Sequence, residues 1–142
     1  MRVTHLEGGA ELEAKLKRLA AAVAGDDLER SVLAGAEPIL SDMVDRTPEE
    51  TGLLNSEIVA ETLAKDALHV TVGIGAFGSK HAHLVEYGHQ LVRGGPLGAG
   101  GHVVGQVPPH PFIRPAYDEH KDDAVTALGD ELRTLLEREA HA

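Results

Sequence analysis

The sequence predicts an α+β fold, in which two N-terminal helices and a long C-terminal helix pack on a small antiparallel β-sheet. Two observations lead to this fold class. Apolar residues recur at helical spacing near both ends of the 142-residue chain, and at a spacing of two in its middle. Helices that are separated along the chain from an antiparallel sheet are typical of α+β domains. We expect one domain over residues 1–142, which is long enough to bury a core without a disulfide or a metal ion.

The first part of the chain, residues 1–46, is predicted to be helical. The apolar stripe of the first helix has members three or four residues apart: Leu12, Leu16, Leu19 and Val23. Gly25 is placed to end this helix, and Asp26 or Asp27 can cap the next one. The second stripe has the same kind of spacing: Leu28, Val32, Ala36, Ile39 and Met43. Because Pro38 lies within it, we expect a kink or two short helices around residues 35–38.

The middle of the chain, residues 47–79, is predicted to hold a turn and a β-hairpin. Apolar side chains alternate with polar or small ones over residues 68–74, as in a strand with one buried face. Residues 56–63 are its predicted antiparallel partner. Residues 64–67 then form the connection between the two strands.

Three further segments complete the chain. Residues 80–88 are predicted to be a short amphipathic segment. Residues 89–111 contain so many Gly and Pro residues that we expect a long flexible loop or arm. Residues 112–142 are predicted to be a helix, with Pro115 in its first turn. The apolar positions of this helix again follow helical spacing: Val125, Leu128, Leu132 and Leu135.

Composition narrows the classes of function. The formal net charge of −10 opposes binding to phosphate backbones, and the sequence contains no cluster of Lys and Arg residues that would attract them. The absence of cysteine excludes a disulfide framework and a thiolate zinc site. No apolar run has the length of a secretory signal or a membrane helix, so we expect a soluble protein. Aromatic residues make up only 3% of the chain, so Ala, Leu and Val must fill most of the core.

The segment KHAHLVEYGHQ brings three histidines and a glutamate within nine positions, which raises the question of a metal site. On a helix His81 and His83 point in different directions, so they cannot chelate one ion together. His83 and Glu86 share part of the H-x-x-E-H zinc motif, but Tyr87 stands where its second histidine belongs. We favour an amphipathic segment with exposed histidines and three side chains turned inward: Ala82, Leu84 and Val85.

A second motif, Gly73–Gly78, matches the G-x-G-x-x-G pattern of dinucleotide-binding proteins. Its strand is predicted to belong to a hairpin, and Arg93 stands near the position where that fold has an acid. A glycine-rich strand end is the better interpretation. A small metal- or nucleotide-binding enzyme using His81–His89 or Gly73–Gly78 stays an alternative, as does a cytoplasmic interaction domain. We expect no cofactor, no metal and no catalytic residues.

Three fragments occur in a fixed order: Pro48–Ser56 (PEETGLLNS), Ala82–Gly88 (AHLVEYG) and His110–Tyr117 (HPFIRPAY). They resemble the P-x-x-T-G-x-L-x-x-S, Y-A-x-x-V-E-F-G-T and P-F-L-R-P-A signatures of the tail-component family of long-tailed bacteriophages. Members of this family are described as tail-completion or head-tail joining proteins. The chain departs from the signatures at His81, where an aromatic residue is usual, and at His89, where Thr is usual.

The resemblance implies structural roles for ten residues. The turn from the helices into the sheet would be formed by Thr51, Gly52 and Leu53. The end of the short segment would be formed by Glu86, Tyr87 and Gly88. The start of the last helix would be fixed by Pro111, Phe112, Arg114 and Pro115. None of these residues is catalytic in what the resemblance implies.

The resemblance also implies a place in a virion. The chain would be one subunit of a homo-oligomeric ring, a hexamer, at the neck between capsid portal and tail tube. Its partners would be connector or stopper proteins and tail-terminator or tail-tube proteins, with assembly in the bacterial host cytoplasm. We expect the loop to reach a neighbouring subunit, and part of the acidic surplus to face the DNA channel. DNA would at most pass through, without specific binding and without contact to a membrane. The particle could be an infectious phage, a prophage or a gene-transfer particle.

Overall fold

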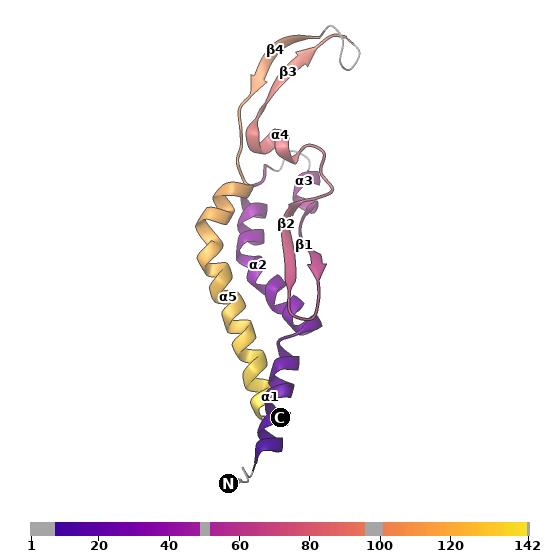
Figure 1. The fold of residues 1–142 in the computed structure, drawn as a ribbon. Helices are drawn as coiled ribbons and strands as arrows, with labels where there is room; N and C mark the ends of the chain where they lie inside the picture. Colours follow the sequence, from indigo (N-terminus) through magenta and orange to yellow (C-terminus); the bar gives the residue numbers. More distant parts are fainter. Residues whose placement is uncertain (1–7, 49–51, 96–100, 142) are drawn as a thin grey trace, which may run out of the picture. The chain divides into compact units, whose positions relative to one another are not determined.

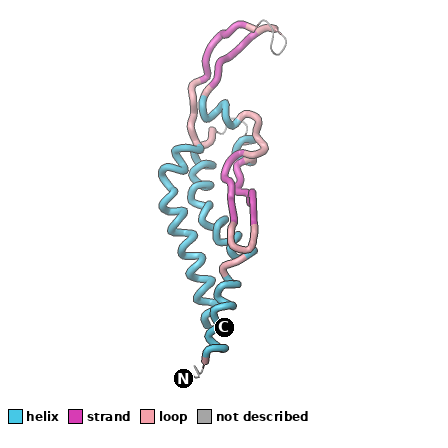
Figure 2. Tube along the Cα trace, in the orientation of Figure 1, coloured by secondary structure: helices cyan, strands magenta, loops and turns pink. Residues whose placement is uncertain are grey.

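The computed structural model describes residues 8–48, 52–95 and 101–141 (Figure 1). Within them the elements follow in this order: α1 (Gly9–Ala22), α2 (Gly25–Arg46), α3 (Leu53–Ser56), β1 (Ile58–Lys65), β2 (Val70–Ala76), α4 (Ala82–Tyr87), β3 (His89–Arg93), β4 (His102–Val107) and α5 (Ile113–His141). The strands form two separate two-stranded sheets, β1–β2 and β3–β4 (Figure 2). This arrangement confirms the α+β class and the long C-terminal helix.

The chain divides into two compact units. Unit 1 consists of residues 1–36, 61–73 and 123–142, and unit 2 consists of residues 37–60 and 74–122. Four elements contribute residues to both units: α2, β1, β2 and α5. The single domain over residues 1–142 stays a prediction, and the two units are described separately below.

The second helix is continuous through its proline. Of the two expectations for residues 35–38, two short helices are not found, because α2 is one helix with Pro38 inside it. The kink stays a prediction. A proline removes only one backbone hydrogen bond, and burial of neighbouring side chains can offset that loss. The side chains of Ala36, Ile39 and Met43 are buried as predicted. The helix begins at Gly25, so Asp26 and Asp27 lie in its first turn rather than at the cap.

Unit 1 contains a close approach between α2 and α5. A Cβ atom added at Gly35 would lie 3.0 Å from the backbone oxygen of Ala124 and 3.0 Å from the Cβ of Leu128. One turn earlier, Ser31 is fully buried and its hydroxyl donates to the backbone oxygen of Asp27 at 2.9 Å. Small side chains at 31 and 35 therefore let the two helices pack closely.

Replacing Gly35 with alanine is expected to destabilise the protein, although alanine favours helices. The added methyl group meets backbone that cannot move freely, so we expect a loss of roughly 1–3 kcal/mol in the free energy of unfolding. Gly129 in α5 is the matched control, because an added Cβ there meets nothing within 4 Å. Gly129→Ala should stabilise by about 0.5–1 kcal/mol. Urea unfolding followed by circular dichroism measures both, and equal gains at both sites would contradict the close packing.

A charged cluster in unit 1 connects the start of α2 to the end of β1. The Lys65 ammonium contacts the carboxylates of Asp26 and Glu29, the latter at 2.7 Å. The Thr62 hydroxyl also donates to Glu29, at 2.6 Å. Hydrogen bonds from Lys65 are the main reason that the pKa of Asp26 and the pKa of Glu29 lie below their ordinary values. The same contacts raise the pKa of Lys65.

The cluster predicts a stability difference that depends on pH. A carboxyl group whose pKa is lowered by folding contributes stability above its unfolded pKa, and that contribution is lost as the pH falls through the folded pKa. Lys65→Met should therefore lower the urea midpoint at neutral pH. The difference from the parent protein should shrink below about pH 4, where the carboxylates take up protons. A difference that stays constant between pH 7 and about pH 3 would mean that Lys65 acts through packing alone.

The region expected to be a loop contains the second hairpin. Residues 89–111 were predicted to lack packed structure, but β3 and β4 pair antiparallel, from His89↔Val107 to Arg93↔His102, with an irregularity between Leu91 and Val92. The prediction was wrong because the glycines crowd residues 94–101, whereas β-favouring Leu and Val residues lie on both sides of them. Gly94 and Gly95 have positive φ angles of 82° and 86°, which suits a hairpin connection.

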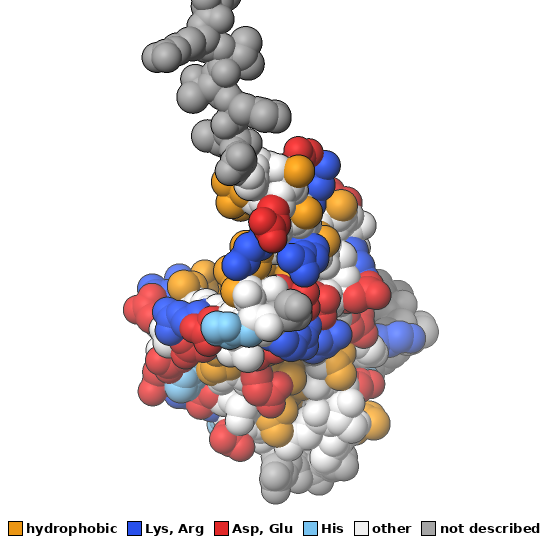
Figure 3. Space-filling model, turned by 90° about the horizontal axis from the view of Figure 1, so that it is seen from below, with side chains coloured by type: hydrophobic (Ala, Val, Ile, Leu, Met, Phe, Trp, Pro, Cys, Tyr) orange, Lys and Arg blue, Asp and Glu red, His pale blue; other side chains and the backbone are white. Residues whose placement is uncertain are grey.

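The surface carries both signs of charge. Asp and Glu side chains are interspersed with Lys and Arg on the face drawn in Figure 3, and apolar side chains reach the surface between them. Exposed apolar side chains include Leu12 and Leu16 of α1, at 56% and 57% exposure. The stripe predicted for this helix therefore exists but is only partly covered. None of the helices in the described ranges combines the length and the apolar character that spanning a membrane requires.

Candidate functional site

The clearest site in unit 2 is built around one buried carboxylate. Glu86, near the end of α4, is only 5% exposed. Its Oε2 accepts hydrogen bonds from the backbone N–H groups of Phe112 (2.7 Å) and Ile113 (3.0 Å), and its Oε1 accepts one from Arg114 (3.2 Å). These donors lie at the start of α5, where a helix has N–H groups without partners in the helix itself. Glu86 therefore caps α5 from a different element, with its negative charge at the positive end of the helix.

The backbone next to Glu86 is packed equally tightly. The N–H of His110 donates to the backbone oxygen of Val85 at 2.8 Å. Gly88 has a φ of +71°, and a Cβ atom there would lie 2.6 Å from the backbone oxygen of Val107 and 2.8 Å from the nitrogen of Pro109. Only glycine suits this combination of conformation and space. The two ends of the β3–β4 hairpin therefore meet at Gly88, directly beside the cap.

The start of α5 also supplies the most buried side chains of unit 2. Phe112 and Ala116 are fully buried, at 0% exposure. Prolines at 111 and 115 restrict the backbone on each side of Phe112 and Ile113, which helps to hold the phenylalanine side chain in the core. We call the combination of Glu86, Gly88 and Phe112 the α4–α5 junction.

The structure brings together seven of the ten residues that the resemblance singled out. Five of the seven line one shallow hollow of about 420 Å³: Glu86, Tyr87, Pro111, Arg114 and Pro115. Asp118, which was not predicted, lines the same hollow. The other two of the seven, Gly88 and Phe112, belong to the junction. Tyr87 is 78% exposed and so does not take part in the core. The last helix, expected over residues 112–142, begins at Ile113.

The remaining three predicted residues lie elsewhere in the chain. Gly52 is the N-terminal cap of α3 with a φ of +68°, and Leu53 is 62% exposed. Thr51 lies outside the described residues, so its predicted role in the turn stays a prediction. Leu53 and Pro48 line a separate hollow of about 410 Å³ in unit 2.

The histidines of the segment 81–89 do not assemble into a ligand set in the described part of the chain. His81 and His83 are exposed, as expected, while Ala82 is buried. The glycine motif ends β2, which pairs with β1 in a hairpin, and so it lacks the parallel sheet of a dinucleotide site.

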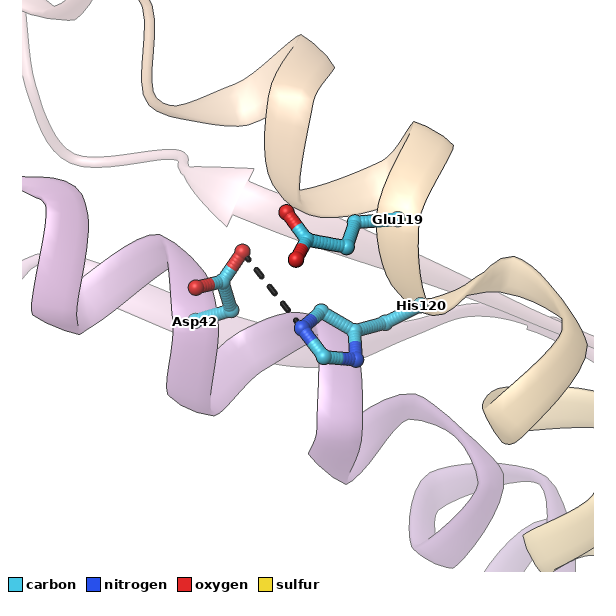
Figure 4. Close-up of side chains that lie close together, drawn as sticks. All are labelled: Asp42, Glu119 and His120. Atoms are coloured by element: carbon cyan, nitrogen blue, oxygen red, sulfur yellow. Dashed lines mark ion pairs between the residues drawn. The ribbon is translucent and has the colours of Figure 1, made fainter.

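A group with metal-ligand chemistry occurs at a place that sequence reasoning missed. Asp42 of α2 and Glu119 and His120 of α5 each offer a ligand atom, and these atoms lie within 4.8 Å of one another (Figure 4). Asp42 Oδ2 lies 3.6 Å from His120 Nε2. No local spacing could reveal this group, because Asp42 is far from the other two residues in sequence and only helix packing unites them.

The two carboxylates of this group already share a cationic partner within the protein. Arg46 Nε lies 2.5 Å from Asp42 Oδ2, and the same guanidinium contacts Glu119. The hydrogen bond to Asp42 is the main reason that the pKa of Arg46 is raised. A cation entering between the carboxylates would have to displace Arg46. The arrangement therefore serves as an ion-pair network that joins α2 to α5 within unit 2.

Comparison with known protein families finds one family model that matches the chain. The family model described as "Bacteriophage HK97-gp10, putative tail-component" matches residues 10–88, which is more than half of the 142 residues. The match runs from α1 through α4 and includes Glu86 and Gly88. No curated protein and no solved structure matches the chain.

Proposed function

The chain belongs to the HK97-gp10-like family of bacteriophage tail components, and from this premise we propose that it is a ring subunit at the virion neck that joins the tail to the head. Membership of the family makes it a structural component of a phage tail and so of a virion. The ring, the neck position and the joining role are the proposed part. A hexamer is the ring size that we propose.

The observation that carries the proposal is the β3–β4 hairpin on its anchored base. We call this hairpin, β3 together with β4, the arm. Four of its aliphatic side chains are about half exposed: Leu91 (45%), Val92 (60%), Val103 (56%) and Val104 (52%). A two-stranded hairpin is at best marginally stable by itself in water, and exposed apolar groups of this kind mark interaction sites. The arm therefore needs a protein partner to cover it.

The anchoring of the arm suits a role in assembly. Its first residue follows Gly88 directly, and its last residue, Val107, contacts Gly88 through the backbone. The cap on α5 holds the same point through Glu86. An arm fixed at its base presents its side chains in a defined direction, which lowers the entropy lost on binding. Head-to-tail contacts between identical subunits can then close into a ring.

The proposed partners follow from the neck position. Connector or stopper proteins would lie on the head side, and tail-terminator or tail-tube proteins on the tail side. We propose that part of the acidic surplus of the chain lines the channel, where repulsion lets DNA slide without specific binding. A neck with a basic lumen at the level of this subunit would exclude that arrangement.

The proposal assigns a structural role without catalysis. The carboxylates that could do chemistry have structural partners: Glu86 accepts from the backbone of α5, and Asp42 and Glu119 bind Arg46. Elemental analysis of the purified protein tests the metal-enzyme alternative, since a stoichiometric metal ion would support it against the structural role.

The arm gives a direct test of the joining function. Val92→Asp places a charge on the exposed face of the arm, so we expect joined particles to fall at least about tenfold, because burying an unpaired charge costs more than 1.4 kcal/mol. Electron microscopy of lysates from the phage or gene-transfer element that encodes the variant measures joined particles against free heads and tails.

The control for this test is a second exposed valine. Val125 in α5 is 69% exposed, so Val125→Asp makes the same chemical change away from the arm. It should leave the proportion of joined particles nearly unchanged. Equal losses for both variants would contradict the role of the arm, and normal joining with Val92→Asp would count against it as well. Imaging of an intact particle then tests the neck position and counts the copies.

A further inference from the structure

Three of the four aromatic side chains in this protein are exposed, and all three belong to unit 2. The chain has two Phe, two Tyr and no Trp. Phe112 is fully buried, but Phe77, Tyr87 and Tyr117 are 48%, 78% and 55% exposed. Aromatic side chains supply most of the binding energy at protein interfaces and are costly to leave in water. Their exposure here marks a surface that another protein covers.

Tyr87 is the most exposed of these three side chains and lines two hollows. It lines the hollow of about 420 Å³ together with Pro111, Pro115 and the carboxylate-bearing Asp118. We call this depression the tyrosine hollow. Tyr87 also lines a second hollow of about 320 Å³, which contains Phe77. Proline and tyrosine side chains are stiff, so an apolar group entering the tyrosine hollow would meet a preformed site.

The charge of the chain is distributed unevenly around the arm. Residues 87–117 contain no Asp or Glu, and their only Lys or Arg residues are Arg93 and Arg114. The remaining residues hold 11 basic and all 23 acidic side chains, a net charge of −12. The arm is thus the weakly basic part of an otherwise acidic protein. The lining of the hollow adds a small negative balance, since it contains Glu86 and Asp118 against Arg114, so the same hollow on another copy is an electrostatic match for Arg93 of the arm.

We propose that the arm of one copy packs into the tyrosine hollow of a second copy. In this contact Val92 and Val103, which are cross-strand partners, lie against Tyr87. Arg93 of the arm then lies near Asp118 on the rim of the hollow, whose carboxylate is 3.9 Å from Arg114 Nε in its own copy and whose side chain is 62% exposed. The inference rests on the proposed ring, because it specifies the contact that neighbouring subunits make.

The contact has to be intermolecular. His89, at the base of the arm, follows Tyr87 and Gly88 directly. Val92 is three residues further along β3, about 10 Å from that base at the usual rise of a strand. The arm cannot bend back into its own hollow without breaking the β3–β4 ladder. Each copy therefore gives its arm to one copy and accepts the arm of another, and head-to-tail contacts of this kind can close into a ring.

Cysteine cross-linking tests the contact without background, because the protein contains no cysteine. Val92→Cys and Asp118→Cys are prepared separately, mixed and oxidised, and the products are separated on a non-reducing gel. We expect a cross-linked dimer in the mixture at least about tenfold above either variant alone, because a disulfide requires Cα atoms within about 7 Å. Val92→Cys mixed with Leu16→Cys is the matched control, since Leu16 is exposed but lies on α1.

A second measurement keeps the test independent of the engineered thiols. Tyr87→Ala should weaken self-association at least about thirtyfold, as expected for an aromatic hot spot. Light scattering during size-exclusion chromatography measures the change, and circular dichroism checks that the variant stays folded. Tyr117→Ala, which removes an exposed tyrosine that does not line the tyrosine hollow, should have the smaller effect.

The outcomes separate this inference from the proposed function. Oligomers that form without the Val92–Asp118 cross-link, or that tolerate Tyr87→Ala, would overturn the arm-in-hollow contact while leaving the ring intact. A Val92 cross-link to another virion protein instead would also overturn it. A protein that stays monomeric in solution at millimolar concentration overturns the inference too, and the ring is then decided by imaging of the particle. Absence of the chain from the neck would remove the proposed function itself.

Discussion

Glu86→Ala is expected to lower the free energy of unfolding by roughly 3–5 kcal/mol, because it leaves the backbone N–H groups at the start of α5 without their acceptor. The N–H of Phe112 is buried in the protein, so water cannot replace the carboxylate there. The same change removes a negative charge from the positive end of a 29-residue helix. Urea unfolding monitored by circular dichroism measures the loss.

The controls for Glu86 separate the cap from the mere loss of an acid. Glu137→Ala removes an exposed glutamate from α5 and should change the free energy of unfolding by less than about 0.5 kcal/mol. Glu86→Gln keeps one acceptor oxygen but turns an amide donor toward backbone donors, so its effect should fall between those of the other two variants. Hydrogen exchange should accelerate at the amides of residues 112–114 in Glu86→Ala. Unchanged exchange there would show that Glu86 does not cap the helix.

Phe112→Ala is expected to be about as damaging as the loss of the cap. Removing a fully buried phenylalanine typically costs about 3–5 kcal/mol, through lost burial and the cavity left behind. Phe112 is 0% exposed and lies directly before α5. The chain has few other large side chains that could relax into the space, since aromatic residues make up only 3% of it. Chemical denaturation gives the loss directly.

The chain offers a matched control for Phe112. Phe77 is the only other phenylalanine and is 48% exposed. Phe77→Ala should cost less than about 1.5 kcal/mol in the isolated protein, because its ring is only half removed from water. A similar loss for both variants would mean that unit 2 is not packed around Phe112. Phe77→Ala can instead weaken self-association, since its ring borders the hollow beside Tyr87.

The α4–α5 junction explains why two of the sequence fragments belong together. AHLVEYG contributes Glu86 and Gly88, and HPFIRPAY contributes Phe112 and the N–H donors. Glu86 and Phe112 are 26 positions apart in the sequence, and the whole arm lies between them. Together the two fragments form the α4–α5 junction, which holds the base of the arm and caps the last helix. Tyr87, between Glu86 and Gly88 in the sequence, is exposed and available for a partner.

The parts of the fold that sequence reasoning predicted correctly are those set by local spacing. Helices α1, α2 and α5 and the β1–β2 hairpin follow from apolar periodicity, which depends only on residues within a few turns or strand positions. Pro115 also indicated the start of α5, because proline is favoured in the first turn of a helix. The hairpin at 89–107 was missed because its glycines, most of which lie between the two strands, lowered the apparent strand signal of the Leu and Val residues beside them.

The sequence by itself determined the α+β class, the long final helix and the resemblance to a phage tail component, because periodicity and motif order are properties of the chain. Only the tertiary structure decided that Glu86 caps α5, that Arg46 forms ion pairs with Asp42 and Glu119, and that Tyr87 is left at the surface. The physical reason is the same in each case. Hydrogen bonds, ion pairs and burial between distant segments depend on how the elements pack, and no local pattern encodes that packing.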